Sequence, residues 1–333
     1  MTARPVNTND EALPSRWYLE QTVNILIPGG SGQVGQTLQR HFESYGHEVV
    51  VLSRHSKTPS ACWDGKTLGD WARHVDAADV VINLAGRTVN CRYTETNLQQ
   101  MMDSRVDSTR VVGQAIQQSA SPPTVWLQMS TATIYAHRFD AANDEATGII
   151  GGQEPDVPAY WSRSIDIAKA WERTLDEADT PETRKVALRT AMVMTPDKDG
   201  VFDVLCGLTK RWLGGRIGSG KQYLSWVHDV DFCRAIDFLI ANDSIDGAIN
   251  IASPNPLPQT DFQQQLRKAL GVKLGLPATK WMAEIGAVFM KTDTKLVLKS
   301  RRVIPGRLLN YGFEFAFPNW SKAVTDLVSR HRW

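Results

Sequence analysis

The first stretch whose residues could do chemistry is a cluster of glycines, ILIPGGSGQVGQTL, at residues 25–38. Gly29, Gly32 and Gly35 follow an apolar run that predicts a strand and open a run that predicts a helix. In that context they allow a tight turn, close approach of the backbone to a pyrophosphate, and close helix–strand packing. The helix N-terminus then holds phosphate through its free N–H groups and its dipole. The stretch predicts a dinucleotide-binding loop, against the alternative of a plain tight turn. The expected contacts are Gly29, Ser31, Gly32, Gln33 and Val34.

The end of the second predicted strand bears on the choice of cofactor. A carboxylate about 20 residues past the glycines would accept hydrogen bonds from the ribose of NAD. The stretch VVVLSRHSK instead places Ser53 and Arg54 in that region. A guanidinium pairs with the 2′-phosphate of NADP, whereas a carboxylate repels it. This pattern favours NADP(H), against the alternative of a solvated arginine at a strand end.

Strand-like and helix-like runs alternate along the chain, which predicts an α/β fold with a parallel sheet between helices. The apolar runs are rich in Val, Ile and Leu, as buried parallel strands are. The predicted architecture is a Rossmann-type doubly wound sheet with a smaller, mainly helical C-terminal substrate lobe. We place an N-terminal extension at 1–21, the sheet domain at 22–195 and the lobe at 196–333, with 223–251 returning to the main sheet.

Composition limits the partners. The 333 residues carry a net charge of +1, so no global field attracts nucleic acid or an acidic membrane. No apolar run approaches the roughly 20 residues that span a bilayer. The four cysteines are scattered without a CxxC pair, which fits free thiols in a reducing compartment. We expect a cytoplasmic protein with a small-molecule substrate, without nucleic-acid or membrane partners, and leave a homodimer open.

Further motifs carry a resemblance to a known family. GGSGQVG, NLAG (83–86) and STATIYA (130–136) resemble extended short-chain dehydrogenases/reductases. GGRIGSGKQYLSWVHDVDFCRAIDFLI, INIASPNP and RRVIPGRLLNYGFEF resemble an atypical branch of NAD(P)-dependent epimerase/dehydratase-like proteins. The resemblance covers about residues 23–318 and implies a doubly wound sheet with NADP(H) across its carboxyl edge. It also implies that the cofactor lies near Leu84, Ala85, Gly86 and Arg105.

Such reductases use a hydroxyl to bind the reacting oxygen, a Tyr to pass a proton, and a Lys four residues after the Tyr. Thr131 matches the hydroxyl, but no Tyr in the chain is followed four residues later by Lys. Alignment places Ser164 and Ala168 at the pair, and Lys169 lies one residue out of register, about 100° around the helix.

Two functions therefore remain open. The first is an NADP(H)-dependent oxidoreductase or epimerase that acts on a small carbonyl or hydroxyl compound, sugar-nucleotide-like compounds included. The second is an NADP(H)-binding sensor or scaffold that has lost its acid–base pair. Tyr160 is the candidate proton donor, against aromatic packing. Tyr135 and Trp226 are expected at the substrate, and His137 is expected to face solvent.

Two charged motifs receive structural interpretations. HDVD (228–231) has no second His or Cys cluster at metal spacing, so we expect no metal and assign Asp231 as the N-cap of a helix at 232–241. A second motif recurs at helical spacing and predicts one cationic, solvated face, with an acidic substrate as the alternative. Its members are Lys291, Lys295, Lys299 and Arg302.

Overall fold

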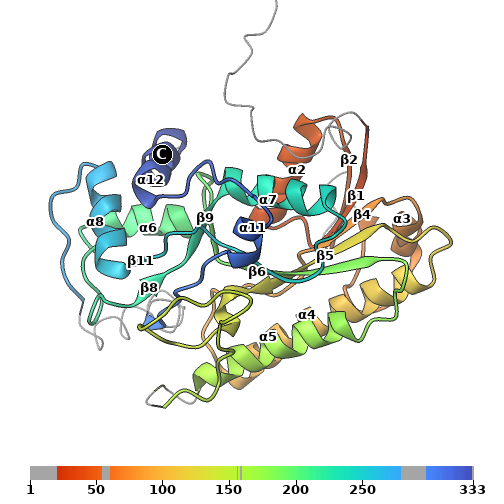
Figure 1. Cartoon of the computed structure of the whole chain (residues 1–333), viewed down its shortest axis with the longest axis horizontal. Coiled ribbons are helices and arrows are strands. Elements are labelled where there is room, and N and C mark those ends of the chain that lie inside the picture. Colours follow the sequence, from red (N-terminus) through yellow and green to blue (C-terminus); the bar gives the residue numbers. More distant parts are fainter. Residues whose placement is uncertain (1–20, 55–60, 156, 158–159, 279–297, 332–333) are drawn as a thin grey trace, which may run out of the picture.

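A seven-stranded parallel sheet forms the centre of the protein (Figure 1). The computed structural model describes residues 21–54, 61–155, 157, 160–278 and 298–331. The strand order is β10-β6-β5-β4-β1-β2-β3, and each neighbouring pair is parallel. The strands are β1 (Asn24–Pro28), β2 (Glu48–Ser53), β3 (Ala61–Cys62), β4 (Val80–Asn83), β5 (Val125–Thr131), β6 (Arg184–Thr190) and β10 (Gly247–Ile251).

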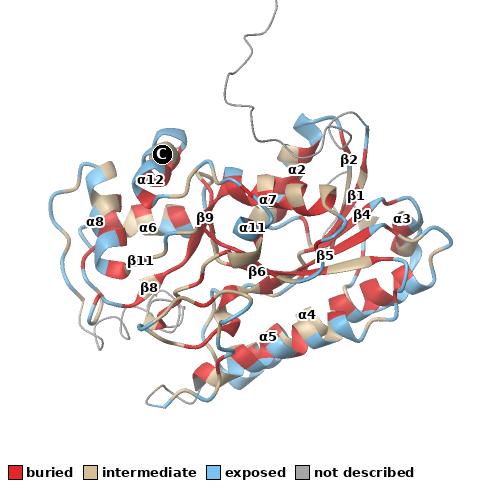
Figure 2. Cartoon of the chain, viewed as in Figure 1, coloured by how far each residue is buried: buried red, intermediate tan, exposed pale blue. Residues whose placement is uncertain are grey.

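Helices cover both faces of this sheet, so the predicted doubly wound fold is confirmed. In β1, Ile25 and Ile27 pack with one set of helices, whereas Leu26 packs with the other. Because both faces are covered, the strands are continuous apolar runs, and all of β4 is buried (Figure 2). One face carries α2 (Gln33–Ser44), α7 (Asp229–Ala241) and α11 (Gly306–Asn310). The other carries η1 (Asp70–Ala72), α3 (Arg73–Asp76), α4 (Glu95–Gln117) and α5 (Tyr160–Asp176).

A smaller, mainly helical lobe lies at one end of the sheet (left in Figure 1). It has its own apolar cluster, in which the rings of Phe262 and Trp320 stack with centroids 4.0 Å apart. The chain then returns to the main sheet, where β10 pairs with β6. The domain limits placed from the sequence stay a prediction. Around the lobe lie β7 (Met192–Met194), α6 (Val201–Lys210), β8 (Tyr223–Leu224), β9 (Trp226–His228), β11 (Leu257–Pro258), α8 (Gln259–Ala269) and α12 (Trp320–Arg330).

Helix α7 begins earlier than the sequence predicts. It starts at Asp229, and the side chain of His228 caps it. The predicted N-cap at Asp231 is wrong, because this residue lies inside the first turn with 0% of its surface exposed. Its carboxylate instead accepts hydrogen bonds from the backbone N–H groups of Ala316 at 2.7 Å and Phe317 at 2.8 Å. Asp231 therefore ties α7 to the segment that leads into α12.

Within the described ranges, no helix has the length and apolar character needed to cross a membrane. The same ranges contain no group of three or more His, Cys, Asp or Glu side chains that could hold a metal. The four cysteines are free. Burial raises the pKa of the Cys206 thiol to about 12, so this thiol stays protonated and unreactive near neutral pH.

Candidate functional site

The loops that follow β1, β2, β4 and β5 meet at one edge of the sheet. These four strands are neighbours in the order β2-β1-β4-β5 and run parallel, so their carboxyl ends lie together. In open parallel sheets, ligands bind beyond these ends. The structure thus brings the glycine loop together with three more groups of predicted site residues, which are Ser53 and Arg54, Leu84 to Gly86, and Thr131.

The loop after β1 packs directly against the loop after β4, because a glycine stands at the point of contact. Gly29 has a φ of +76°, and its N–H donates to the carbonyl of Leu52 at 2.9 Å. A Cβ added to Gly29 would lie 2.6 Å from the Cα of Ala85, closer than real contacts allow. Only glycine therefore fits here, for reasons of both conformation and space.

The other two glycines of the spacing differ in their surroundings. A Cβ on Gly35 would lie 2.2 Å from the carbonyl oxygen of Gly30, so Gly35 serves the packing of α2 on the loop. A Cβ on Gly32 would meet nothing closer than 3.8 Å, the carbonyl of Gly29. Gly32 is the N-cap of α2 and has no side-chain cap. The protein itself therefore leaves room at Gly32, beside the free N–H groups of the helix.

The remaining residues of the glycine loop take different positions. Ser31 is exposed and accepts a hydrogen bond from the hydroxyl of Ser53 at 3.3 Å. Arg54 follows directly and is exposed. Val34 is half-buried and packs against the apolar core. Gln33 is different, because its Nε2 is buried and has no hydrogen-bond partner within the described residues.

The loop after β4 is held by one backbone–backbone hydrogen bond and one hydrogen bond from the backbone to a side chain. The N–H of Leu84 donates to the carbonyl of Pro28 at 2.8 Å, and the N–H of Ala85 donates to the Asn83 side chain at 3.0 Å. The Arg105 guanidinium would lie 3.3 Å from a Cβ on Gly86. The loop is therefore fixed to β1 on one side and contacts helix α4 on the other.

Arg105, on helix α4, forms hydrogen bonds that hold this loop in place. Its guanidinium donates to the carbonyls of Met101 at 3.0 Å and Arg87 at 3.1 Å, and it lies 4.9 Å from the ring centroid of Trp171. Burial lowers the pKa of Arg105 to about 10, so the side chain remains charged near neutral pH. Its predicted contact with a cofactor stays a prediction.

Thr131 is the last residue of β5, and its role in binding a reacting oxygen stays a prediction. Its Oγ1 accepts a hydrogen bond from the N–H of Thr133 at 3.1 Å. Thr133 belongs to the short helix η2 (Ala132–Ile134), which packs against α5. Thr133 also contacts two residues of the C-terminal segment, Lys299 and Arg301.

Helix α5 offers no standard acid–base pair to Thr131. Tyr160 is its first residue, and the Tyr160 side chain lies outside the described structure. Ala168 is fully buried and clusters with Ala132 of η2. Lys169 is exposed. A small apolar side chain thus stands where the lysine of the family motif was aligned, and the proton-donor role of Tyr160 stays a prediction.

Tyr135 lies deeper than a pocket wall usually does, with 2% of its surface exposed. Its hydroxyl donates to Asn250 at 2.9 Å and accepts from Arg189 at 3.0 Å. Burial raises the pKa of this phenol. Arg189 in turn pairs with Glu172 at 2.7 Å. These contacts are enough to explain Tyr135 as a structural residue, and its substrate contact stays a prediction.

Trp226 lies in the core of the lobe. Its exposure is 0%, and its ring centroid lies 4.9 Å from that of Trp320. A side chain with no exposed surface lines no open pocket, so the structure gives Trp226 a packing role. The predicted contact of Trp226 with substrate stays a prediction.

Sequence reasoning missed the segment that follows residue 297. Lys299 has 0% exposure, so the prediction of a solvated face is wrong for this member, because the chain folds it under the β5 loop. Its Nζ donates to the carbonyl of Thr133 at 2.9 Å. Arg301 is also buried, and its Nε donates to the hydroxyl of Thr133 at 3.2 Å. Lys291 and Lys295 lie outside the described residues.

Electrostatics make Lys299 unusual. Burial, followed by the charge of Arg301, lowers its pKa to about 7, and the charge of Glu154 opposes that shift. The Glu154 carboxylate itself accepts hydrogen bonds from the N–H groups of His137 at 2.8 Å and Gly152 at 2.5 Å. An amine with this pKa is present in both protonation states near neutrality. The sequence around Lys299 gave no indication that its side chain is buried.

His137 is half-buried, so the prediction that it faces solvent is wrong. Its Nδ1 accepts a hydrogen bond from the N–H of Ser300 at 2.7 Å, and its ring contacts Phe139 and Trp161. Burial lowers the pKa of His137, with the charge of Lys299 acting in the same direction. The imidazole therefore stays neutral near pH 7 and anchors the C-terminal segment.

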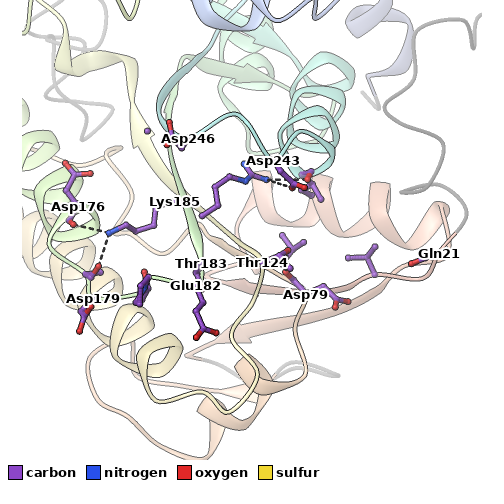
Figure 3. Close-up of a pocket in the computed structure, with 18 of the residues that line it drawn as sticks. Gln21, Asp79, Thr124, Asp176, Asp179, Glu182, Thr183, Lys185, Asp243 and Asp246 are labelled. Atoms are coloured by element: carbon purple, nitrogen blue, oxygen red, sulfur yellow. Dashed lines mark hydrogen bonds and ion pairs between the residues drawn. The ribbon is translucent and has the colours of Figure 1, made fainter.

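A cavity of about 1030 Å³ lies elsewhere, at the amino edge of the sheet (Figure 3). Its lining includes Asp79, Thr124 and Asp246, each directly before a strand, together with Lys185 of β6 and Asp176 at the end of α5. Lys185 Nζ donates to the carbonyl of Asp176 at 3.0 Å. Because nucleotides bind at the opposite edge of such sheets, we exclude this cavity from the candidate site.

The glycine loop on a doubly wound sheet defines the class as a Rossmann-type nucleotide-binding protein. Residues 25–155 match the NAD dependent epimerase/dehydratase family, and residues 278–327 match a domain of unknown function, DUF1731. Residues 25–155 thus form an epimerase/dehydratase-family domain, and the match supports the predicted resemblance of the chain to atypical extended short-chain dehydrogenases/reductases.

Relatives match over nearly the whole chain. An epimerase family protein of Staphylococcus epidermidis is 29% identical over 308 residues, which is 91% of this chain and 98% of that protein. The crystal structure of human epimerase family protein SDR39U1 with NADPH superposes with a TM-score of 0.80 at 25% identity, covering 92% and 99% of the two chains. A nucleoside-diphosphate sugar epimerase of Corynebacterium glutamicum, at 22% identity, has a TM-score of 0.74 and shares the fold, over 95% of this chain and 62% of that one.

The packing of Gly35 leads to a stability prediction. Gly35→Ala should lower the free energy of unfolding by about 1–3 kcal/mol, because the new methyl group overlaps the backbone of Gly30. Urea denaturation followed by circular dichroism measures the change. Unchanged stability would contradict the close helix–loop contact.

Proposed function

We propose that the chain is an NADP(H)-dependent oxidoreductase or epimerase that acts on a small carbonyl or hydroxyl compound. The observation that carries the proposal is the glycine loop at the carboxyl edge, with Arg54 at the end of the neighbouring strand. The human relative with a TM-score of 0.80 was crystallised with NADPH, which supports the same cofactor here.

The residues present fit this cofactor. The open space at Gly32 admits a pyrophosphate beside the N–H groups that begin α2. The Nε2 of Gln33 is buried beside Gly200 and has no partner within the described residues, so it is left with an unused donor next to the loop. Arg54 and the serines beside it offer positive charge and hydroxyls to a 2′-phosphate. The loop Leu84 to Gly86 would then lie along the adenosine half.

Bound at this loop, NADPH would supply the hydride for the reaction. The hydroxyl of Thr131 holds the reacting oxygen of the substrate, since its oxygen already accepts from Thr133 and its own hydrogen remains to donate.

A sensor or scaffold is the second candidate. The specific observation that favours it is Ala168, which is buried against η2 where a catalytic lysine was aligned. A binding protein of this kind would take up NADPH and turn nothing over.

The first test of the cofactor compares NADPH with NADH. NADPH should bind more tightly, and Arg54→Asp should reverse that order. A charge-assisted contact is worth about 1.5–3 kcal/mol, so NADPH affinity should fall roughly ten- to a hundredfold or more. Fluorescence titration at fixed, moderate salt measures both constants. Arg173→Asp, an equal charge change at an exposed position on α5, should leave them unaltered. Equal wild-type affinities for the two cofactors would rule out the role of Arg54.

The second test concerns the loop. Gly32→Val should abolish NADPH binding while the melting temperature stays unchanged, because the new side chain meets ligand space and not protein. Binding is followed by NADPH fluorescence and folding by thermal denaturation. Wild-type affinity in this variant would show that the pyrophosphate lies elsewhere.

The third test separates enzyme from sensor. Single-turnover NADPH oxidation is measured against a panel of small aldehydes, ketones and nucleotide sugars. Thr131→Val should remove most activity without changing NADPH affinity. Loss of an acid–base group costs about 10²–10⁴-fold, so a loss of that size in Tyr160→Phe would identify Tyr160 as a proton donor. A wild type that binds NADPH and is inert across the panel would favour the sensor.

A further inference from the structure

Two loops at the outer end of the lobe carry exposed apolar side chains. The segment after α8 runs along this end, away from the sheet (left in Figure 1). Trp212 and Leu213 follow α6, Leu274 and Leu276 follow α8, and between 53% and 61% of each residue is exposed. Single exposed apolar residues are common, but a group of large ones on adjoining loops indicates an interaction surface. We call these four residues the apolar tip.

Backbone contacts hold the two loops side by side. The N–H of Leu276 donates to the carbonyl of Trp212 at 2.7 Å. A Cβ on Gly215 would lie 2.2 Å from the carbonyl oxygen of Leu276, so the loops touch where Gly215 has no side chain. The Arg267 guanidinium of α8 also donates to the carbonyl of Gly214. The four side chains of the apolar tip are therefore presented together on one fixed support.

Trp212 occupies a backbone position that favours glycine. Its φ is +64°, and its N–H donates to the carbonyl of Thr209 at 3.0 Å. The N–H of Leu213 donates to the carbonyl of Leu208 at 2.9 Å, so α6 ends in a Schellman motif. Helix α8 ends in the same motif, with Gly271 at a φ of +66° in the equivalent position. A side chain in this conformation is strained, and because Trp212 is largely exposed, the fold gains little from a tryptophan here.

Basic residues surround the apolar tip. Residues 204–222 and 262–278 contain seven Lys or Arg and no Asp or Glu. Arg211, Lys268 and Lys273 are exposed, and within the described residues none of the three forms an ion pair. Lys268 lies in the last turn of α8, where it also stabilises the helix dipole, whereas Lys273 lies beyond the helix end beside the apolar tip. The net charge of +1 for the whole chain therefore conceals a local excess of positive charge.

We propose that the apolar tip docks on the surface of a bilayer that contains anionic phospholipids. Trp212 and the three leucines enter the boundary between headgroups and acyl chains, where tryptophan is favoured, and the surrounding cations contact the lipid phosphates. A contact of this kind lies on a bilayer and does not span it. The inference is independent of the proposed oxidoreductase function. It departs from the expectation of no membrane partner, which rested on the net charge of the whole chain and on apolar runs too short to span a bilayer.

A lipid surface fits this combination of side chains better than other occupants do. In a symmetric dimer the same surface of two copies would face itself, so Arg211 and Lys273 would meet like charges. Nucleic acid would pair with the cations but gains little from exposed leucines, because its affinity comes mainly from phosphate contacts. Anionic headgroups and acyl chains match both kinds of side chain at once.

Sedimentation with vesicles tests the proposal on the full chain. The protein should sediment with vesicles of phosphatidylcholine mixed with phosphatidylglycerol but not with phosphatidylcholine alone, and raised salt should weaken the binding. Trp212→Gly and Leu274→Ser should each weaken it about tenfold, because each removes a large apolar side chain. Lys273→Glu should weaken it about 25-fold, because it changes the charge by two and each charge near such a surface contributes about fivefold.

Two matched variants outside the lobe serve as controls. Ile149→Ser removes a similarly exposed aliphatic side chain in the loop before α5, and Arg173→Glu reverses an exposed charge on α5. Both should bind vesicles as wild type does. Thermal denaturation gives a second readout, in which Trp212→Gly should melt at the wild-type temperature or above it, because glycine relieves the strained conformation.

Several results would overturn the proposal, and none of them depends on NADPH or turnover, so the proposed function is tested separately. Binding of wild type that the three variants of the apolar tip leave unchanged would place the contact on another surface. A wild type that ignores anionic vesicles would exclude a lipid surface. Retention on immobilised polyglutamate, lost in Lys273→Glu, would then assign an acidic protein partner, and a dimer that Trp212→Gly dissociates would assign a second copy. A lower melting temperature of Trp212→Gly would give the tryptophan a packing role.

Discussion

The backbone of the β1–α2 loop lies so close to its neighbours that two positions exclude any side chain. Gly29 packs against Ala85 of the loop after β4, and Gly35 packs against the carbonyl of Gly30. These contacts hold the beginning of α2 over the ends of β1 and β4. The free N–H groups and the positive end of the helix dipole therefore lie at the carboxyl edge, where the other candidate residues end their strands.

A second constraint comes from the C-terminal segment, which joins the lobe to the sheet. Ser225 donates from its hydroxyl to the carbonyl of Arg301 at 2.7 Å and accepts from the N–H of Val303 at 2.9 Å. Further along, Asp231 holds the backbone at Ala316 and Phe317. Because the same segment also contacts the loop after β5, the lobe and the candidate reaction point are mechanically linked.

Three buried cationic side chains near the candidate site differ in their partners. Arg189 pairs with Glu172, so its charge is compensated and stabilises the region around Tyr135. Arg105 is buried on backbone carbonyls and the face of an indole, which supports the loop after β4. Lys299 has neither kind of compensation within the described residues beyond one carbonyl. Lys299 therefore differs from the two arginines in how little its charge is compensated, and burial lowers its pKa to about 7.

The sequence by itself determined the doubly wound fold, and it located the glycine loop and Arg54, because hydrophobic periodicity and turn chemistry are local properties. It also showed that the Tyr-x-x-x-Lys pair is absent. Only the tertiary structure decided the fate of side chains whose partners are distant in the chain. Because Lys299 recurs at helical spacing with other cations, the sequence predicts a solvated side chain. In the structure it is buried against Thr133, which lies 166 residues away in the chain. The sequence predicts Asp231 as a helix cap, but its carboxylate accepts hydrogen bonds from backbone N–H groups 85 and 86 residues further along the chain. The local sequence pattern predicts the secondary structure of a segment. The burial of its side chains depends on which distant segment packs against it.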